Sequence, residues 1–462
     1  MSIDDSGLKD KQEVGAIVDI NVNNNHPLIY LSNALPWKEL AKLVLPDLKT
    51  TTKKRLWWLG RPLRLRVHLG TYILQHLYNI TDRQMEYAIK DNAAYQLFCG
   101  RNSVKKWHCP DHTKIEEFRS RLNPETQQQL ANHFAKIAVK LGFANPEKLD
   151  IDSTIQEANM AYPSDIHLLS QLAIKAKKVW EYMQKRFSTF TFEPIKIDLK
   201  AIKKQARACY FSRSKDKEEK ENLLSDLWVC VFRKVMAVTK RLGILDDYDF
   251  KEMPWNIRRL SNQLKDYAHD YFVDVCKFLN NGVIEPTKRL SFHLQEVACF
   301  NKNKPNKKYQ FGRAFQLGRI AGNFLLVGKN NSVRMNDKHA VEPMIKLHQQ
   351  LFPKTSSLST AMDKGYYTKK NASYLRENTG SNIGLQKPSN VKTKNSSDDY
   401  TELINRRAGI EPLIGHTKQG GQLGKSRMKY DQTTESAGYA SILGFNGRQL
   451  IRYLTGKAFL TT

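Results

Sequence analysis

The segment "LDIDSTIQEANMAYPSD" (Leu149–Asp165) places two acids, Asp150 and Asp152, within an apolar, β-branched frame. Residues two apart in an extended strand share a face, so both carboxylates point one way while Leu149 and Ile151 point the other. Two like charges on a half-buried face cost free energy unless a positive group lies between or opposite them. The segment therefore predicts a strand whose acids face a lysine, an arginine or a metal ion.

The composition indicates a folded protein with a polyanionic partner. The chain has 462 residues, 40% of them hydrophobic, which is enough for two or three domains with apolar cores. Lysine and arginine outnumber aspartate and glutamate by 74 to 46, and this excess favours nucleic acid as the partner. No apolar run approaches the roughly 18 residues of a membrane span, and no signal peptide or lipidation motif is present, so no membrane contact is expected.

Cysteine usage argues against a zinc site. The six cysteines lie far apart and form no CxxC pair, which favours reduced thiols and a cytoplasmic location. The stretch "WHCPDH" (Trp107–His112) has the residue types of a metal cluster but lacks partners. We interpret it as a loop followed by the start of a helix.

The N-terminal part divides into a polar, flexible segment (1–35) and a helical DNA-binding domain (36–145). "LRVHLGTYILQHLYNI" and "TDRQMEYAIKD" have apolar residues three and four apart, which predicts two helices, the second capped by Thr81 or Asp82. Two helices joined by a short turn can bind DNA as a helix-turn-helix, or can simply pack together.

A basic stretch precedes these helices. "TTTKKRLWWLGRPLRLRV" (Thr50–Val67) contains no acid, and its basic residues are interleaved with two tryptophans. This pattern is typical of a surface that follows a phosphate backbone, although a solvated face with tryptophans in the core would have the same sequence. The DNA-binding candidates here are Lys53, Lys54, Arg55, Arg61, Arg64 and Arg66.

From Leu149 onward the pattern predicts a mixed α/β core interrupted by helices. Residues 163–300 are helical and lysine-rich, and are interpreted as a structural or DNA-clamping insertion. "KYQFGRAFQLGRI" and "FLLVG", joined by "AGN", predict a β-hairpin. A helix, the strand "SLSTAM", a helix capped by Thr368, the strand "NIGLQ" and a last helical region follow. Without the insertion the order is β, β, β, α, β, α, β, α, which is that of a ribonuclease H-like fold.

This order defines the remaining expected domains. The ribonuclease H-like catalytic core comprises residues 146–162 and 301–420, and a C-terminal helical segment comprises residues 421–462. Three acids in the core have notable positions: Asp152 on the first strand, Asp363 at the end of the fourth, and Glu411 after the fifth. Reactive groups collect at strand ends in α/β sheets.

Carboxylates that converge in a basic protein suit hard divalent cations. Mg²⁺ (or Mn²⁺) takes oxygen ligands, and two such ions can support in-line displacement at a phosphodiester. Two other acids compete for these roles. Asp150 shares a face with Asp152 and is either a further ligand or an exposed acid, and Glu435 is a rival to Glu411 for the third position.

The segment "NRRAGIEPLIGHTKQ" combines Glu411 with two cations. On one helix, Arg407, Glu411 and Lys418 would share a face, which would place two phosphate-binding cations beside a metal ligand. Pro412 opposes a continuous helix, because the residue before a proline avoids the helical region. We therefore expect a kink or a new helix start at this point.

Taken together, these motifs resemble those of DDE transposases of bacterial insertion sequences, in the four/five superfamily. "IDSTIQEANMAYPSD" is similar to their first-aspartate segment, "AMDKGYY" to the second, and "RAGIEPLIGHTK" to the glutamate segment. The resemblance extends roughly from Trp37 to Leu454. It departs from the family pattern at Ile404, where many relatives have a tyrosine, and in the position of the insertion, between the first and second acids.

The resemblance implies a catalytic and metal-binding triad of Asp152, Asp363 and Glu411 with two Mg²⁺ or Mn²⁺ ions. It also implies that Arg407 and Lys418 contact double-stranded DNA at terminal inverted repeats, with target DNA as the second substrate. Relatives act as homodimers or larger assemblies on paired ends, in the bacterial cytoplasm in association with the nucleoid.

Two alternative functions stay open at this stage. A decayed transposase would act as a catalytically silent DNA-binding regulator, and a ribonuclease H-like nuclease would cut without strand transfer. A tyrosine recombinase would need an H-x-x-R segment, which "HTKQ" (His416–Gln419) does not provide.

Overall fold

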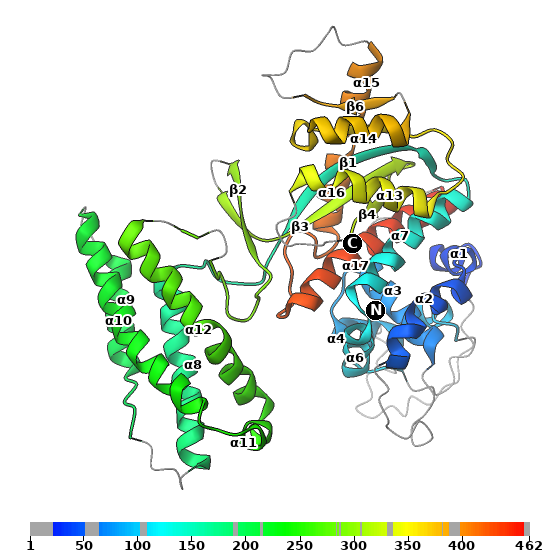
Figure 1. The fold of residues 1–462 in the computed structure, drawn as a ribbon. Coiled ribbons are helices and arrows are strands. Elements are labelled where there is room, and N and C mark those ends of the chain that lie inside the picture. Colours follow the sequence, from blue (N-terminus) through cyan, green and yellow to red (C-terminus); the bar gives the residue numbers. More distant parts are fainter. Residues whose placement is uncertain are drawn as a thin grey trace, which may run out of the picture. The chain divides into compact units, whose positions relative to one another are not determined.

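The computed structural model describes most of the chain, and it separates into two compact units (Figure 1). The described ranges are residues 22–50, 64–101, 109–187, 193–212, 216–282, 284–285, 288–304, 307–329, 336–380, 382–387 and 398–456. We call residues 159–298 the helical unit, and residues 1–158 with 299–462 the sheet unit. The helical unit corresponds closely to the predicted insertion, 163–300.

The sheet unit is built on a mixed β-sheet. Its strands are β1 (Asn145–Glu157), β2 (Ala298–Lys304), β3 (Lys307–Ala321), β4 (Phe324–Val327), β5 (Ser359–Met362) and β6 (Ile383–Leu385). The strand order is β2-β3-β1-β5-β6, and β4 pairs with β3. β1 is antiparallel to β3 and parallel to β5, and β5 is parallel to β6.

The predicted hairpin is confirmed as β3 and β4. The turn between them is Gly322–Asn323, with φ of 92° and 63°. Because Ile320 is in register with Phe324, the loop comprises Ala321–Asn323, and three-residue hairpin loops commonly end in a left-handed residue. A Cβ on Gly322 would lie 2.2 Å from the carbonyl oxygen of Phe143, so this position requires glycine for space as well as conformation.

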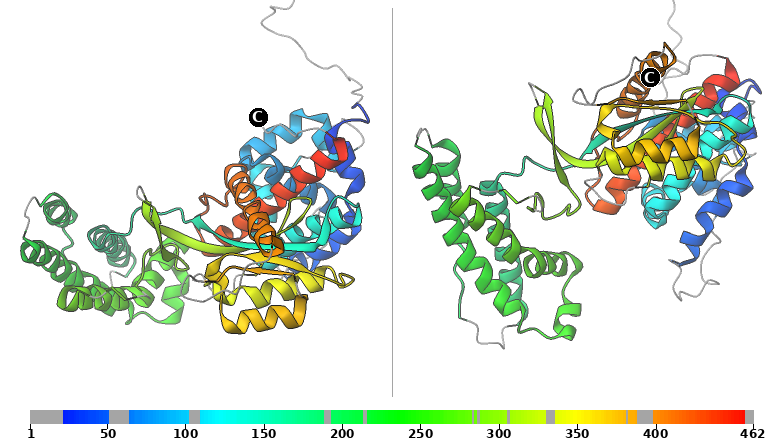
Figure 2. Two further views of the ribbon diagram at one scale, coloured as in Figure 1. Left: turned by 90° about the horizontal axis from the view of Figure 1, so that it is seen from above. Right: turned by 45° about the horizontal axis from the view of Figure 1, so that its top comes forward.

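The two faces of β1 carry different layers of helices (Figure 2). Leu149 and Ile151 are fully buried on one face, where Leu149 and Met344 of α13 (Val341–Leu351) both pack against Gly318. Helix α14 (Lys369–Thr379) lies beside α13. The acids of β1 point to the opposite face, which carries α15 (Asp398–Arg407), α16 (Ile410–Gln419) and α17 (Asp431–Thr455). The alternation predicted from the opening segment is therefore confirmed.

Helices from the N-terminal part pack around α17 and share one core with the sheet. They are α1 (Pro27–Ala34), α2 (Trp37–Thr50), α3 (Leu65–Tyr78), α4 (Asp82–Asp91), α5 (Ala93–Phe98), α6 (His112–Arg121) and α7 (Pro124–Lys140). The expectation that residues 1–35 form a flexible segment is wrong for α1, because Leu28 and Leu31 are fully buried. The helical domain expected at 36–145 is part of the sheet unit and not a separate compact body.

Buried amides of α7 and α17 join these helices to the edge strand β4. Asn132 of α7 accepts from the Val327 N–H (2.8 Å) and donates to the Val327 carbonyl (3.0 Å). Asn446 of α17 accepts from the Leu325 N–H (2.9 Å) and donates to its carbonyl (2.8 Å). These side chains satisfy backbone groups that an edge strand would otherwise expose.

Local capping follows the sequence signals. Thr81 caps α4 in a capping box with Gln84, and Thr368 caps α14. Asp111 caps α6, which confirms the loop and helix start expected in "WHCPDH", although Trp107 and His108 lie outside the described residues.

The helical unit has its own apolar core. Its helices are α8 (Asp165–Arg186), α9 (Leu199–Phe211), α10 (Lys217–Leu242), α11 (Asp247–Glu252) and α12 (Trp255–Asn281). The predicted helical span to residue 300 is too long, because α12 ends at Asn281, followed by Gly282 in a left-handed conformation (φ 67°), and β2 begins at Ala298. Among the described helices, none has the length and apolar character needed to cross a membrane.

Candidate active site

Asp150 and Asp152 share a face of β1 but have different surroundings. Asp150 is 2% exposed, and its Oδ1 accepts a hydrogen bond of 2.8 Å from Nε of Arg406. Nη1 of Arg319 lies 3.6 Å from the other carboxylate oxygen. Burial raises the pKa of Asp150, while the two guanidinium groups oppose this shift. The alternative of an exposed acid is wrong: Asp150 is a buried ion-pair partner.

Arg406 is itself held in place by the neighbouring strand and by Arg319. It donates to Oγ of Ser359 (2.8 Å) and to the Ser359 carbonyl (3.2 Å) on β5. Arg319 donates to the Arg406 carbonyl (3.0 Å) and passes beside Gly409, where a Cβ would lie 2.0 Å from Nη1 of Arg319. The break between α15 and α16 at this glycine therefore leaves room for Arg319 to lie beside Arg406, where both arginines reach Asp150 of β1.

Asp152 faces a third arginine. Its Oδ2 lies 3.7 Å from Nη1 of Arg407, and its Oδ1 accepts the Ser153 N–H at 2.7 Å. Burial raises the pKa of Asp152, and the negative charges of Asp363 and Glu411 also raise it. The hydrogen bond from the Ser153 N–H and the charge of Arg407 act in the opposite direction.

Asp363 follows β5 directly and lies next to Asp152, which is within β1. Ile151 of β1 is in register with Met362 of the parallel strand β5, so the next residue of each strand is one of these acids. Oδ1 of Asp363 accepts the Gly365 N–H at 2.6 Å, and Oδ2 lies 3.8 Å from Nη1 of Arg407.

Glu411 completes the group from α16. Its Oε1 accepts a hydrogen bond of 2.7 Å from Nη2 of Arg407. Arg407 is the last residue of α15, and α16 begins at Ile410, which confirms the new helix start expected before Pro412. The side-chain exposure increases from 18% at Asp152 to 38% at Asp363 and 62% at Glu411. The group is therefore open to solvent on the Glu411 side.

Arg407 thus lies within 4 Å of all three predicted acids, and it is their common counter-charge. Three carboxylates are suitable oxygen donors for a divalent cation in kind and in charge. In the arrangement described, however, no group of three or more His, Cys, Asp or Glu side chains within the described ranges could hold a metal ion. The guanidinium group supplies the positive charge that the acids require.

The rival acid Glu435 belongs to a different ion pair. Its Oε2 lies 2.7 Å from Nη1 of the buried Arg313, and its Oε1 accepts from the Tyr439 hydroxyl at 2.9 Å. Arg313 is in register with Gln156, four residues beyond Asp152 on β1. Glu435 therefore neutralises a buried arginine at another point along the strand.

The predicted DNA-binding residues have varied positions. Lys53, Lys54, Arg55 and Arg61 lie outside the described residues. Arg64 is exposed at the start of α3, whereas the Arg66 guanidinium is 2.9 Å from the ring centroid of Trp37 and donates to Oγ of Ser32 at 3.1 Å. Burial lowers the pKa of Arg66 to about 10.

Lys418 lies in the last turn of α16 and is half-buried, with its Cβ and Cγ beside Gly424. The sequence predicts Arg407 and Lys418 as site residues but does not identify Arg406 or Arg319. The sequence indicates that Asp150 needs a positive partner, but no local pattern shows that Arg406 and Arg319 are the partners.

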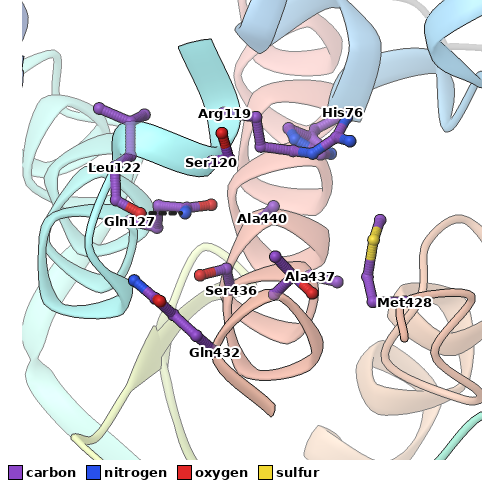
Figure 3. A pocket seen from close by; sticks show the side chains of 11 residues that line it. His76, Arg119, Ser120, Leu122, Gln127, Met428, Gln432, Ser436, Ala437 and Ala440 are labelled. Carbon is purple, nitrogen blue, oxygen red and sulfur yellow. Dashed lines mark hydrogen bonds between the residues drawn. The ribbon is translucent and has the colours of Figure 1, made fainter. Parts of the chain in front are cut away.

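Two pockets lie away from the acids. A small one, about 10 Å³, is bordered by α17, by His76 of α3 and by Arg119 and Gln127, and has room for about one water molecule (Figure 3). Burial lowers the pKa of His76 there to about 3. A larger pocket of about 600 Å³ lies at the start of β1, at Asn145–Glu147, and is lined by α7 and the segment after α13. Neither pocket is lined by Asp152, Asp363 or Glu411.

Comparison with known proteins points to one class. Residues 17–121 match the family model described as "Transposase domain (DUF772)", which supports a transposase family for this chain. The matched range covers most of the N-terminal helices and ends before β1. A transposase domain suggests a transposase function, which at a coarse level means an enzyme that acts on and cleaves DNA.

Among curated proteins, the chain is similar to "Uncharacterized protein ORF8 in nfe locus" of Rhizobium meliloti. The two are 25% identical over 169 residues, which is 35% of this chain and 78% of that protein. No solved structure matches the chain.

Proposed function

We propose that this protein is a DDE transposase of the insertion-sequence four/five superfamily, with a ribonuclease H-like catalytic core. It would bind terminal inverted repeats, cleave the ends of the element and join 3′-hydroxyls to target DNA. The observation that carries the proposal is the convergence of Asp152, Asp363 and Glu411 on Arg407, from two adjacent parallel strands and a following helix. The alternation of strands and helices after β1, with β2 as an addition, supports this fold.

The three carboxylates would hold two Mg²⁺ or Mn²⁺ ions. Such ions activate a water or 3′-hydroxyl nucleophile and stabilise the leaving oxygen at a phosphodiester. The chain itself orients two of the acids, because the Ser153 and Gly365 N–H groups fix one oxygen of Asp152 and of Asp363 at 2.7 and 2.6 Å. Each carboxylate therefore keeps its second oxygen directed toward Arg407.

Arg407 would exchange partners during this reaction. With no DNA bound, its guanidinium group balances the three acids. A phosphate of the DNA offers a bidentate partner of equal or greater strength, so Arg407 would turn to the backbone as cations occupy the acids. Lys418, on the following helix, would add a second contact to the transposon end.

The partners follow from this chemistry. The substrates are double-stranded DNA at the terminal inverted repeats and target DNA. A homodimer or larger assembly on paired ends would allow both ends to be joined together. In a bacterial cell the protein would act in the cytoplasm, in association with the nucleoid.

The test is DNA cleavage and strand transfer on labelled element-end duplexes with Mg²⁺. Wild type is compared with Asp152→Ala, Asp363→Ala and Glu411→Ala, and Glu435→Gln tests the rival acid. Loss of both reactions in the three alanine variants, with DNA binding retained, supports the proposal. A wild type that binds without cutting indicates a regulator, cutting without joining indicates a nuclease, and an active Glu411→Ala excludes Glu411 as the third ligand.

A further inference from the structure

Helix α9 of the helical unit has an unusual charge pattern. Between Leu199 and Phe211 it contains no acid, and its basic residues follow one another at helical spacing. Positions i, i+3, i+4 and i+7 lie on one face of a helix, so these side chains form a continuous line. We call Lys200, Lys203, Lys204 and Arg207 the α9 basic stripe; all four are exposed.

The opposite face of α9 anchors the helix to its unit. Ile202 and Ala206 are buried in the core of the helical unit, in contact with the layer formed by α8 and α10. Asp198 caps the helix by accepting the N–H groups of Lys200 (2.8 Å) and Ala201 (3.1 Å). The stripe is therefore presented to solvent by a fixed helix.

Among the described residues of the helical unit, the acid that interacts with the stripe is Asp198, whose pKa is lowered by its backbone hydrogen bonds and also by Lys200. Within the described part of the chain, none of its four side chains forms an ion pair, whereas Lys177 pairs with Glu181 and Lys288 with Asp165. Like charges three and four residues apart destabilise a helix. Because the stripe neither packs against the core nor pairs, it does not stabilise the fold, and a bound polyanion would remove the repulsion.

An exposed aromatic side chain extends the stripe. Phe211 is four residues beyond Arg207, on the same face, and is 78% exposed. Its neighbour Tyr210 is 53% exposed, and its hydroxyl contacts Oγ of Ser164 on the same unit. Aromatic groups next to basic ones are typical of surfaces that contact sugar and base as well as phosphate.

We infer that the α9 basic stripe, with Phe211, is a sequence-independent binding surface for the backbone of duplex DNA. The four basic residues extend over about 10 Å of helix, and one DNA strand has a phosphate per ~3.4 Å of axis. The stripe therefore matches about three phosphates of one strand. The choice of DNA as the polyanion rests on the proposed function, while the location and the charge pattern do not.

The test measures the salt dependence of duplex DNA binding by the full chain. A stripe variant carries Lys200→Gln, Lys203→Gln, Lys204→Gln and Arg207→Gln. Each lost phosphate contact lowers the slope of log K against log salt by about 0.9, so we expect a reduction of roughly 2 to 4. A matched control removes four exposed charges from α8, α10 and α11: Lys178→Gln, Lys185→Gln, Arg233→Gln and Lys251→Gln. We expect its slope to change by less than about 1.

A second variant tests the aromatic part without changing charge. We expect Phe211→Ala to weaken binding on the order of tenfold while leaving the salt slope unchanged. It also serves as an independent readout if the stripe variant does not fold, with Lys203→Gln plus Arg207→Gln as the reduced charge variant.

The outcomes separate this inference from the proposed function. Equal slopes for the stripe variant and the control overturn the inference, as does a wild type that binds no duplex DNA. Cleavage of element-end DNA by the wild type is measured in parallel, as the readout of the proposed catalysis. If the wild type binds but never cuts, the proposed catalysis fails, while a reduced slope in the stripe variant still supports the DNA-binding surface.

Discussion

Two acids on one strand, two residues apart, differ in almost everything except their direction. Asp150 is buried and held by Arg406 and Arg319, each of which is itself fixed by hydrogen bonds to neighbouring groups. Asp152 shares Arg407 with two other acids and lies on the side that opens to solvent. The difference indicates that an acid surrounded by its own arginines serves the fold, whereas acids that must share one arginine are available for another cation.

The largest expected effect comes from removing Asp152. We expect Asp152→Ala to slow cleavage of element-end DNA by roughly 10³-fold, the typical cost of losing one charged group from a reaction centre. Its thermal midpoint should stay nearly unchanged, because Arg407 keeps Asp363 and Glu411 as partners. Cleavage time courses and thermal melts measure both. A large fall in the melting midpoint would give Asp152 the structural role assigned to Asp150.

The reverse result is expected for Asp150. Asp150→Ala leaves Arg406 and Arg319 without their buried partner, and the free energy of unfolding should fall by about 3 kcal/mol. Urea denaturation with tryptophan fluorescence measures this, with Asp152→Ala as the matched control two residues away. Equal stability of the two variants would remove the distinction between the acids.

His76 provides a reference in which burial is not offset by a direct ion pair. Its folded pKa is lowered to about 3 from 6.5, so the folded state resists protonation. The contribution of His76 to the free energy of unfolding is fully present above pH 6.5 and is lost as the pH falls toward 3. At pH 5 the free energy of unfolding is lower by roughly 2 kcal/mol for this reason. His76→Gln should lack this loss. Unfolding midpoints of the wild type and of His76→Gln at pH 7 and pH 5 test this prediction. An equal change in the midpoint of both proteins between the two pH values would contradict it.

The smallest effect concerns Arg407. If it competes with cations for the acids, Arg407→Gln should raise the affinity for Mn²⁺ without DNA, on the order of tenfold. Arg406→Gln is the control, and it should change stability but not Mn²⁺ affinity. Titration calorimetry measures the binding. Unchanged affinity in Arg407→Gln would mean that the guanidinium group does not occupy a cation position.

Much of the sheet could be predicted because its signals are local. The alternation in β1, the Gly322–Asn323 turn, the cap at Thr368 and the helix break before Pro412 are all written within a few residues. The proximity of Asp152 and Asp363 follows from the parallel pairing of β1 with β5, although Asp152 lies within β1 and not at its end. That the three acids function as a triad stays a prediction.

Other features depend on distant or competing signals. The contact of Arg406 with Asp150 joins residues 256 positions apart, and no local pattern specifies it. Strand β2, "ACFNKNK", lacks an apolar alternation and forms because β3 offers it an edge. Helix α1 had usable signals, Pro27 at its start and Leu28 and Leu31 three apart, but asparagines before it gave the segment a polar appearance.

The position of the helical unit between β1 and β3 has a consequence for synthesis of the chain. β1 is synthesised before the helical unit, and its antiparallel partner β3 is synthesised after it. The backbone groups of β1 that pair with β3 are therefore unpaired while the helical unit is made. Within that unit, His293 contacts the Asn159 carbonyl at 3.1 Å and Lys288 contacts Asp165 at 2.8 Å, which brings its two ends together. Once folded, the unit therefore shortens the flexible loop between β1 and β3. Most of the chain entropy that pairing of these strands would cost is then lost before the strands pair.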